Sequence, residues 1–205
     1  MTTTDRQEPE QDGAYRHELL DLARRSIAHY LTKGEPLPYT PDIPRLREPA
    51  AVFVTLRLRY DPQLAPAEEG EDLRGCIGQI EADKPLYAAV QDAAIKAATA
   101  DPRFYPVVAE ELPGLWIEIS ILSPLRPVAR PEEILVGQDG LLLVGPHQRG
   151  LLLPEVPVMY GWDRDEFLRA IHSKAGLPQG FWPEGFGDDM AWLYAFTTNS
   201  FEEAH

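Results

Sequence analysis

The residue best suited by type to carry chemistry is the only cysteine of the chain, in the segment 73–78. Cys76 lies between Gly75 and Gly78, and glycines weaken a strand unless the backbone bulges or another group approaches it closely. A thiol becomes a nucleophile or a metal ligand when nearby cations or helix ends lower its pKa. In a regular strand, Arg74 would share a face with Cys76 and could act in this way. A small buried apolar role for the cysteine stays open beside the functional one.

Other chemical signatures are missing from the sequence. The single cysteine and the five scattered histidines show none of the paired spacings of a structural zinc site. A phosphate-binding glycine loop, a dinucleotide fingerprint and a nucleophile elbow are also missing. We therefore predict no metal and no cofactor.

Composition favours a soluble protein of the cytoplasm. A chain of 205 residues fits one domain, or one larger domain with a small lobe. The formal net charge of −14 repels nucleic acid and anionic membranes. Five arginines between positions 45 and 74 could still form a local basic patch, so nucleic acid is an unfavoured partner. One cysteine excludes an intrachain disulfide, and no leader or long apolar run follows Met1, so we expect a cytoplasmic location and no membrane segment.

Hydrophobic periodicity places these residues on a series of strands and helices. Residues 1–13 are polar and aperiodic, so we predict a disordered tail followed by a single domain over 14–205. Helices are predicted at 14–31, 85–100 and from Asp163, where Glu166 completes a capping box. Strands are predicted at 51–60, 73–80, 115–122, 134–136, 141–144, 151–153 and 190–196. The first two form a hairpin, and those from 134 to 153 form an antiparallel meander.

The order of these elements predicts an α+β fold. Strands followed by a helix occur in two similar runs, which indicates an internal duplication and not an alternating βαβ pattern. Within the strand at 51–60, apolar and polar residues alternate, so one face of the strand should be buried and the other wet. The strand at 115–122 alternates in the same way and places Glu118 and Ser120 on its polar face.

Six segments in order resemble those of the AMMECR-domain family, from about residue 23 to residue 201. They are residues 73–78, 101–104, 111–113, 117–124, 150–154 and 174–178. The resemblance implies two unequal lobes around a largely antiparallel, barrel-like sheet with flanking helices. It also implies, for prokaryotes, the first component of the AmmeMemoRadiSam system, whose companions are a Memo-like protein and a radical-SAM protein. It names no reaction.

The resemblance further implies a shared polar site. Its residues are Arg74, Cys76, Asp101, Arg103, Glu118, Ser120 and Lys174, with Gly75 and Gly78 shaping the backbone. Among them we assign catalytic roles to Cys76, Arg74 and Lys174, and substrate binding to the others. His172 stands where many members carry a second cysteine, which weakens a mechanism that needs two thiols. The loop from Tyr60 to Asp72 is longer than the family's usual link.

Each polar residue of this set also has a structural explanation. Asp101 could turn the chain before a proline, and Arg103 could pair with Asp101 or Glu118 to join two elements. Lys174 near a helix end could offset the helix dipole.

Two functions remain open on the sequence alone, with a nucleic-acid role as a third. The first is an enzyme or enzyme subunit in which Cys76 is a nucleophile or redox thiol, aided by a cation that stabilises a thiolate or an anionic substrate. The second is a non-catalytic binding or adaptor protein in which the same segment shapes a groove for a partner.

Overall fold

Two compact units make up the chain in the computed structural model, which describes residues 7–58, 73–145, 147–177 and 192–204. The first unit comprises Met1–Ile121 and Ser200–His205, and the second comprises Leu122–Asn199. Each unit has its own hydrophobic core and a four-stranded sheet. The α+β class is therefore confirmed. The barrel-like description is not, because neither sheet closes on itself within the described residues.

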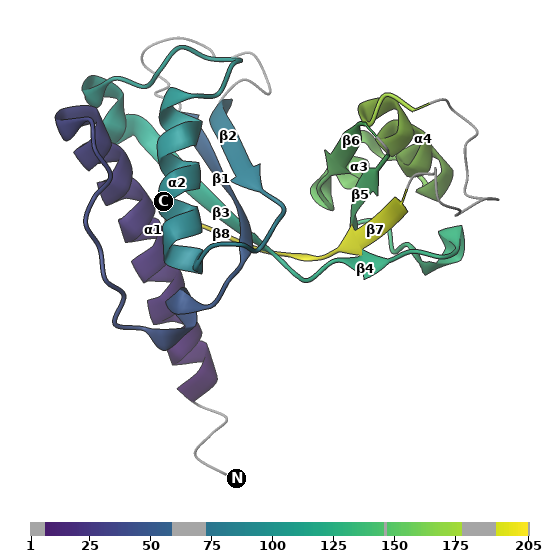
Figure 1. Ribbon diagram of the computed structural model, residues 1–205, viewed down its shortest axis with the longest axis horizontal. Helices are drawn as coiled ribbons and strands as arrows, with labels where there is room; N and C mark the ends of the chain where they lie inside the picture. The colour runs from purple at the N-terminus through teal and green to yellow at the C-terminus, as the bar shows by residue number, and fades with distance from the viewer. Residues whose placement is uncertain (1–6, 59–72, 146, 178–191, 205) are drawn as a thin grey trace. The chain divides into compact units, whose positions relative to one another are not determined.

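The first unit packs two helices on one face of its sheet (Figure 1). Its elements are α1 (Gln7–Lys33), η2 (Pro44–Arg47), β1 (Ala51–Leu58), β2 (Leu73–Gln79), α2 (Leu86–Thr99), η3 (Ala109–Gly114), β3 (Leu115–Leu122) and β8 (Thr198–Glu202). The strands lie in the order β2-β1-β3-β8, and β1 and β2 pair antiparallel, as the sequence predicts.

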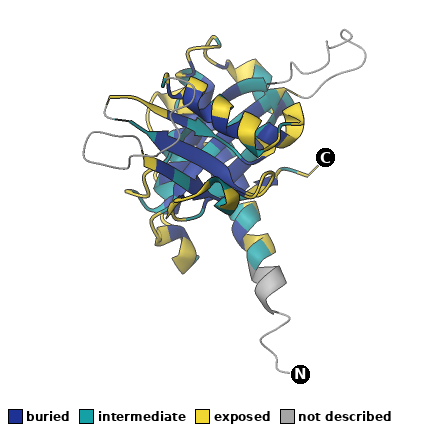
Figure 2. Ribbon diagram, turned by 90° about the vertical axis from the view of Figure 1, so that its right-hand side faces the viewer, coloured by how far each residue is buried: buried dark blue, intermediate teal, exposed yellow. Residues whose placement is uncertain are grey.

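Alternation along the strands decides which face the helices cover. Val52, Val54 and Leu56 of β1 are fully buried in the helix-facing core, as the period-two pattern predicts. Figure 2 shows buried residues on strands and on helices alike. The alanine-rich face of α2 lets this helix lie close to β1 and β2, because alanine adds little bulk.

Helix α1 begins earlier than the sequence pattern indicates. It starts at Gln7, so part of the tail predicted for residues 1–13 is helical, while residues 1–6 lie outside the described residues. Acidic residues in the first turns favour a helix N-terminus, and Asp12 forms ion pairs with Arg16 and with Arg45. These ion pairs support the N-terminal part of the helix.

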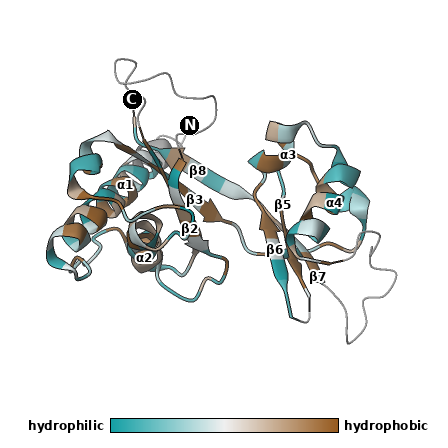
Figure 3. Ribbon diagram, turned by 90° about the horizontal axis from the view of Figure 1, so that it is seen from above, coloured by the Kyte–Doolittle hydropathy of each residue, from teal (hydrophilic) through white to brown (hydrophobic). Residues whose placement is uncertain are grey.

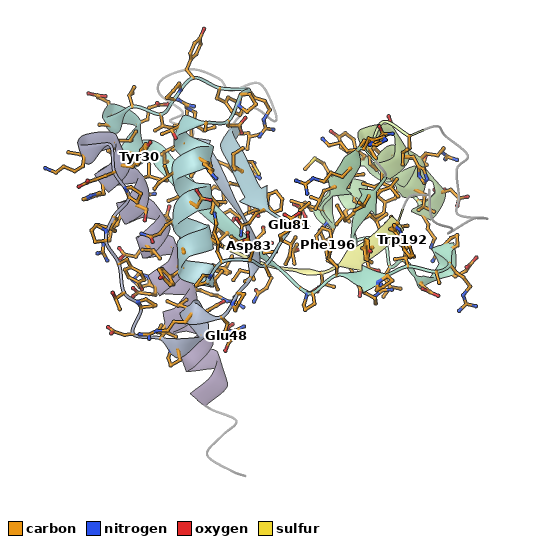
Figure 4. All side chains as sticks on the ribbon, viewed as in Figure 1. Tyr30, Glu48, Glu81, Asp83, Trp192 and Phe196 are labelled. Atoms are coloured by element: carbon orange, nitrogen blue, oxygen red, sulfur yellow. The ribbon has the colours of Figure 1, made fainter. Side chains whose placement is uncertain are left out.

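The second unit contains the remaining elements. They are β4 (Arg126–Pro127), η4 (Pro131–Glu133), β5 (Gly140–Val144), β6 (Arg149–Leu152), α3 (Glu155–Tyr160), α4 (Arg164–Lys174) and β7 (Trp192–Phe196). The sheet order is β4-β7-β5-β6, with antiparallel pairs throughout. Trp192 and Phe196 mark the two ends of β7 (Figure 4). The predicted capping box is confirmed, because Asp163 and Glu166 each accept the other's backbone N–H.

The meander predicted for the second unit is wrong in one strand. Residues 134–136 are not a strand, because η4 begins at Pro131 and the Asp139 carboxylate holds the backbone N–H of Leu135 at 2.9 Å. The neighbour of β5 opposite β6 is β7, from much later in the chain. Both units contain a four-stranded sheet, but the strands follow one another in a different order in each sheet. The two units are therefore similar in the kinds of element they contain and not in topology.

The C-terminal segment is fastened to the first unit through Glu203. Its carboxylate accepts two 2.6 Å bonds from Arg24 and one of 3.1 Å from the backbone N–H of Ile117. Its carbonyl accepts a 2.8 Å bond from the Trp116 indole. The residue thus connects α1, β3 and the chain end.

We expect Glu203→Gln to lower the free energy of unfolding by about 1–2 kcal/mol, because charge-assisted bonds to a partly exposed arginine are lost. Urea unfolding followed by circular dichroism measures this difference. Glu202→Gln, at the exposed neighbouring position, is the matched control and should stay close to the wild type. Equal effects of the two changes would contradict the assignment.

No helix in the described part of the chain is long and apolar enough to cross a membrane.

Candidate functional site

A polar face lies on the first sheet, opposite the face covered by α1 and α2. The antiparallel register pairs Thr55 with Cys76, so both side chains project to this side. On β3 the buried isoleucines face the helices, and the residues between them face the other way. The polar face therefore carries Thr55, Arg57, Cys76, Glu118, Ser120 and Ser200.

Cys76 is half-buried on this face and its sulfur is hydrogen-bonded. The Thr55 hydroxyl donates to Sγ over 3.3 Å. Burial raises the pKa of the Cys76 thiol above its ordinary value, against the lowering effects of the Thr55 bond and of Arg103. The carboxylates of Asp101 and Glu118 raise this pKa further. The thiol is therefore protonated at neutral pH.

The backbone of Cys76 is held by an ion pair from the segment after α2. In an antiparallel ladder, a residue in a non-hydrogen-bonded pair turns its N–H and C=O away from its neighbour, and β2 is an edge strand. Asp101 Oδ2 accepts the outward N–H of Cys76 at 2.8 Å, and Arg103 Nη2 lies 3.4 Å from its C=O. The Asp101–Arg103 pair thus occupies the place of a further strand at this point of the edge.

Asp101 and Arg103 bind each other through two parallel contacts. Arg103 Nε lies 3.0 Å from Oδ1 and Nη2 lies 2.7 Å from Oδ2. The Arg103 guanidinium, and then the backbone N–H groups of Cys76 and Arg103, hold the pKa of Asp101 well below its usual range despite burial. The Asp101 side chain is 2% exposed, whereas that of Arg103 is 53% exposed. A buried carboxylate therefore fixes a solvent-facing guanidinium beside the thiol-bearing residue.

The two glycines of the segment are explained by close approach of neighbouring groups. A Cβ on Gly75 would collide with the carbonyl oxygen of Ala97 in α2. A Cβ on Gly78 would collide with the Phe53 ring and the carbonyl oxygen of Val52. The glycines thus let the edge strand lie tightly against α2 and β1, which fixes where Cys76 sits.

Arg74 points to a different partner from the one the sequence favours. The register shifts between Leu56 and Arg57, and this irregularity leaves Arg74 without a strand partner. Its guanidinium binds Glu111 at 2.7 and 3.0 Å and the carbonyl of Tyr105 at 2.8 Å. With 13% of its side chain exposed, Arg74 fastens the segment before β3, and its catalytic role stays a prediction.

Two further contacts complete the polar face. Arg57 Nη2 lies 3.6 Å from Glu118 Oε2, and the hydroxyls of Ser120 and Ser200 lie 2.8 Å apart. The predicted residues Glu118 and Ser120 are therefore on the face of the thiol.

Membership of a family follows from comparison with known proteins. The AMMECR1 family profile matches residues 20–201. This chain belongs to the AMMECR1 family. It is 45% identical over 196 residues to a protein of Thermococcus gammatolerans, covering 91% of this chain and 89% of that protein. Its identity to protein PH0010 of Pyrococcus horikoshii is 44% over 196 residues, with the same coverage of each chain.

A crystal structure of PH0010, described there as uncharacterized, shows the same fold. Its TM-score with this chain is 0.77 at 42% sequence identity, covering 90% of this chain and 89% of that chain. The AMMECR1 match extends through both compact units.

Two residues that the sequence analysis singled out lie in the second unit. Lys174 is exposed at the end of α4, and His172 is buried with Nδ1 2.7 Å from the carbonyl of Leu168. Neither is among the groups that the first unit gathers around Cys76. The role predicted for Lys174 stays a prediction.

The polar face also contains residues outside the predicted site. Thr55 and Arg57 lie on the solvent-facing side of a predicted strand. The hairpin predicted between this strand and residues 73–80 is the feature from which the position of Thr55 opposite Cys76 could have been inferred. Ser200 belongs to a strand that the sequence pattern does not show. Among the described residues, no three His, Cys, Asp or Glu side chains come together as metal ligands.

Proposed function

We propose that this AMMECR1-family chain is an enzyme, or a subunit of one, whose reactive group is the Cys76 thiol. The observation that carries the proposal is the fixed position of two different groups on one strand edge. Asp101 holds the backbone of Cys76 and the guanidinium of Arg103 at the same time. Such preorganisation is typical of a reactive side chain beside a binding group.

The protonated resting thiol limits the chemistry. Attack of Sγ on an electrophilic carbon forms an S–C bond while a carbon–heteroatom bond of the substrate breaks and its electron pair goes to the heteroatom. The thiol proton is released, and the Glu118 carboxylate on the same face is the candidate acceptor. A redox role through a disulfide would require a thiol from another molecule, because the chain has one cysteine. The half-exposed side chain of Arg103 suits an anionic group of the substrate, since guanidinium binds carboxylate and phosphate oxygens.

Alkylation of the single thiol tests this proposal. We expect iodoacetamide to modify the folded protein with a rate that rises through a pKa above the ordinary value of about 8.5. In this reaction the sulfur bonds to carbon, iodide leaves and the thiol proton passes to water. Thr55→Val should move the midpoint to higher pH, because the bond that favours the thiolate is lost. Mass spectrometry against time at each pH gives the rates.

Anionic iodoacetate tests the role of Arg103 separately. The ratio of the iodoacetate rate to the iodoacetamide rate should fall in Arg103→Gln relative to the wild type. Arg25→Gln, an exposed arginine of α1, is the matched control and should leave the ratio unchanged. A thiol that reacts only after unfolding in urea would overturn the proposal. An unchanged ratio in Arg103→Gln would remove Arg103 as the anion-binding group.

Other expectations from the sequence stay predictions. They are the Memo-like and radical-SAM partners, the cytoplasmic location, the low affinity for nucleic acid and the adaptor role.

A further inference from the structure

Five apolar side chains form an exposed surface in the second unit. We call this surface the apolar patch. Its members are Leu135 (51% exposed), Val136 (36%), Val158 (63%), Met159 (72%) and Tyr160 (64%). Large apolar side chains that gather on a surface mark an interaction site more often than single ones do.

The members come from two segments that lie side by side. A Cβ on Gly137 would stand 3.1 Å from Val158 Cγ2, so the segment after η4 touches α3. Arg164 Nε donates to the carbonyl of Ile134 over 3.2 Å, which joins the same segment to the start of α4. Figure 3 shows hydrophobic colour on α3. The two segments of the patch therefore adjoin at Gly137 and Val158.

Both segments are held in place by buried or stacked groups. Asp139, 4% exposed, accepts the backbone N–H of Leu135 and the guanidinium of Arg126. Tyr160 stacks on Trp162 with ring centroids 4.9 Å apart. A surface fixed in this way loses little conformational freedom when a partner covers it.

The surroundings of the patch are acidic. Segments 130–139 and 155–166 contain seven acidic and two basic residues. The basic residues already have local partners, because Arg130 pairs with Glu133, Arg164 donates to Ile134, and Arg126 from outside the two segments pairs with Asp139. Glu132, Glu155 and Asp163 are exposed. Electrostatic complementarity therefore favours a basic partner.

We propose that the apolar patch docks a basic amphipathic helix of a partner protein. Its apolar stripe would cover Val158, Met159 and Leu135, and its lysines or arginines would face Glu132, Glu155 and Asp163. Helices with one apolar face commonly bind such surfaces. This function goes beyond the Cys76 site and uses none of its residues.

A synthetic peptide serves as the probe. It is a dye-labelled 18-residue helix with leucine on one face and lysine on the other, and its control carries glutamate in place of lysine. Fluorescence anisotropy at physiological salt should show that the wild type binds the lysine peptide and not the glutamate peptide. The double variant Val158→Ser, Met159→Ser should weaken this binding by about tenfold.

A matched variant separates a specific surface from general charge attraction. Tyr105→Ser with Val108→Ser removes two exposed apolar side chains of the first unit and should leave the affinity unchanged. Both variants should keep the wild-type circular dichroism spectrum. Equal weakening by the two variants, or no binding by the wild type, would overturn the proposal. So would a wild-type dimer, seen by sedimentation, that the Val158→Ser, Met159→Ser variant dissolves, because a second copy would then cover the patch.

Discussion

Gly75→Ala is expected to lower the free energy of unfolding by about 3 kcal/mol, because the new methyl group collides with backbone and not with a movable side chain. The obstacle is the carbonyl group of Ala97 in α2. To remove this collision, α2 would have to move away from β2, although the two elements are closely packed against each other. Thermal unfolding should shift by roughly 6–12 °C for a chain of this size.

The control is Gly13→Ala, at a helical position of α1 where a Cβ would meet nothing within 4 Å. This change should leave the protein unaffected or stabilise it by up to about 1 kcal/mol, because alanine favours a helix over glycine. A loss of stability in Gly75→Ala no larger than in Gly13→Ala would show that the sheet and helix are less tightly packed than the structure places them.

Periodic segments of the fold are predictable from the sequence, because burial of one face imposes the pattern directly. The strand predicted at 115–122 coincides with β3, and the helix predicted at 85–100 closely matches α2. The apolar residues alternate along the strand and recur at three- or four-residue steps along the helix, so a short stretch of sequence is enough to predict each element.

Elements without such a pattern depend on distant parts of the chain. Helix α3 has six residues with a proline inside, and its exposed apolar residues show no buried stripe. Strand β8 alternates weakly, and only Phe201 reaches the core. Strand β7 lies within the strand predicted at 190–196, but its pairing with β5 was not predicted, because the two strands are about fifty residues apart in the sequence.

In the candidate site, too, some features can be predicted from the sequence and others depend on distant contacts. The sequence identifies Cys76, Asp101 and Arg103 through a resemblance, but which arginine faces the thiol depends on a bulge and on Glu111. Arg74 binds Glu111, whereas Arg103 binds Asp101 and lies beside the carbonyl of Cys76. The spacing in the sequence favours Arg74 as the neighbour of the thiol, because residues two apart share a face in a regular strand. The register shift between Leu56 and Arg57 makes the strand irregular at this point, so the rule does not apply.

Asp101 combines an edge-capping role with a role beside the thiol. Its carboxylate satisfies an outward N–H of β2 that would otherwise be open to pairing with another chain. The same carboxylate orients Arg103. The structural and the functional explanation of this pair are therefore compatible, and stability measurements can determine how much the charge contributes.

Asp101→Asn is expected to lower the free energy of unfolding by about 2 kcal/mol at pH 7. The asparagine oxygen can still accept the N–H of Cys76, but the charge-assisted pair with Arg103 is lost at a buried position. Asp21→Asn, which removes an exposed pair with Arg25, is the control and should cost less than about 0.5 kcal/mol.

The pH dependence of this difference tests its electrostatic origin. Because folding lowers the pKa of Asp101, its contribution is fully present above the unfolded-state pKa of about 3.9 and disappears as pH falls below it. Urea unfolding at pH 7, 5 and 3 should show the gap between wild type and Asp101→Asn constant at the first two values and smaller at the third. Carboxylates common to both proteins cancel in this difference. A gap that is the same at pH 3 as at pH 7 would mean that shape, and not the ionised carboxylate, holds Arg103 and Cys76 together.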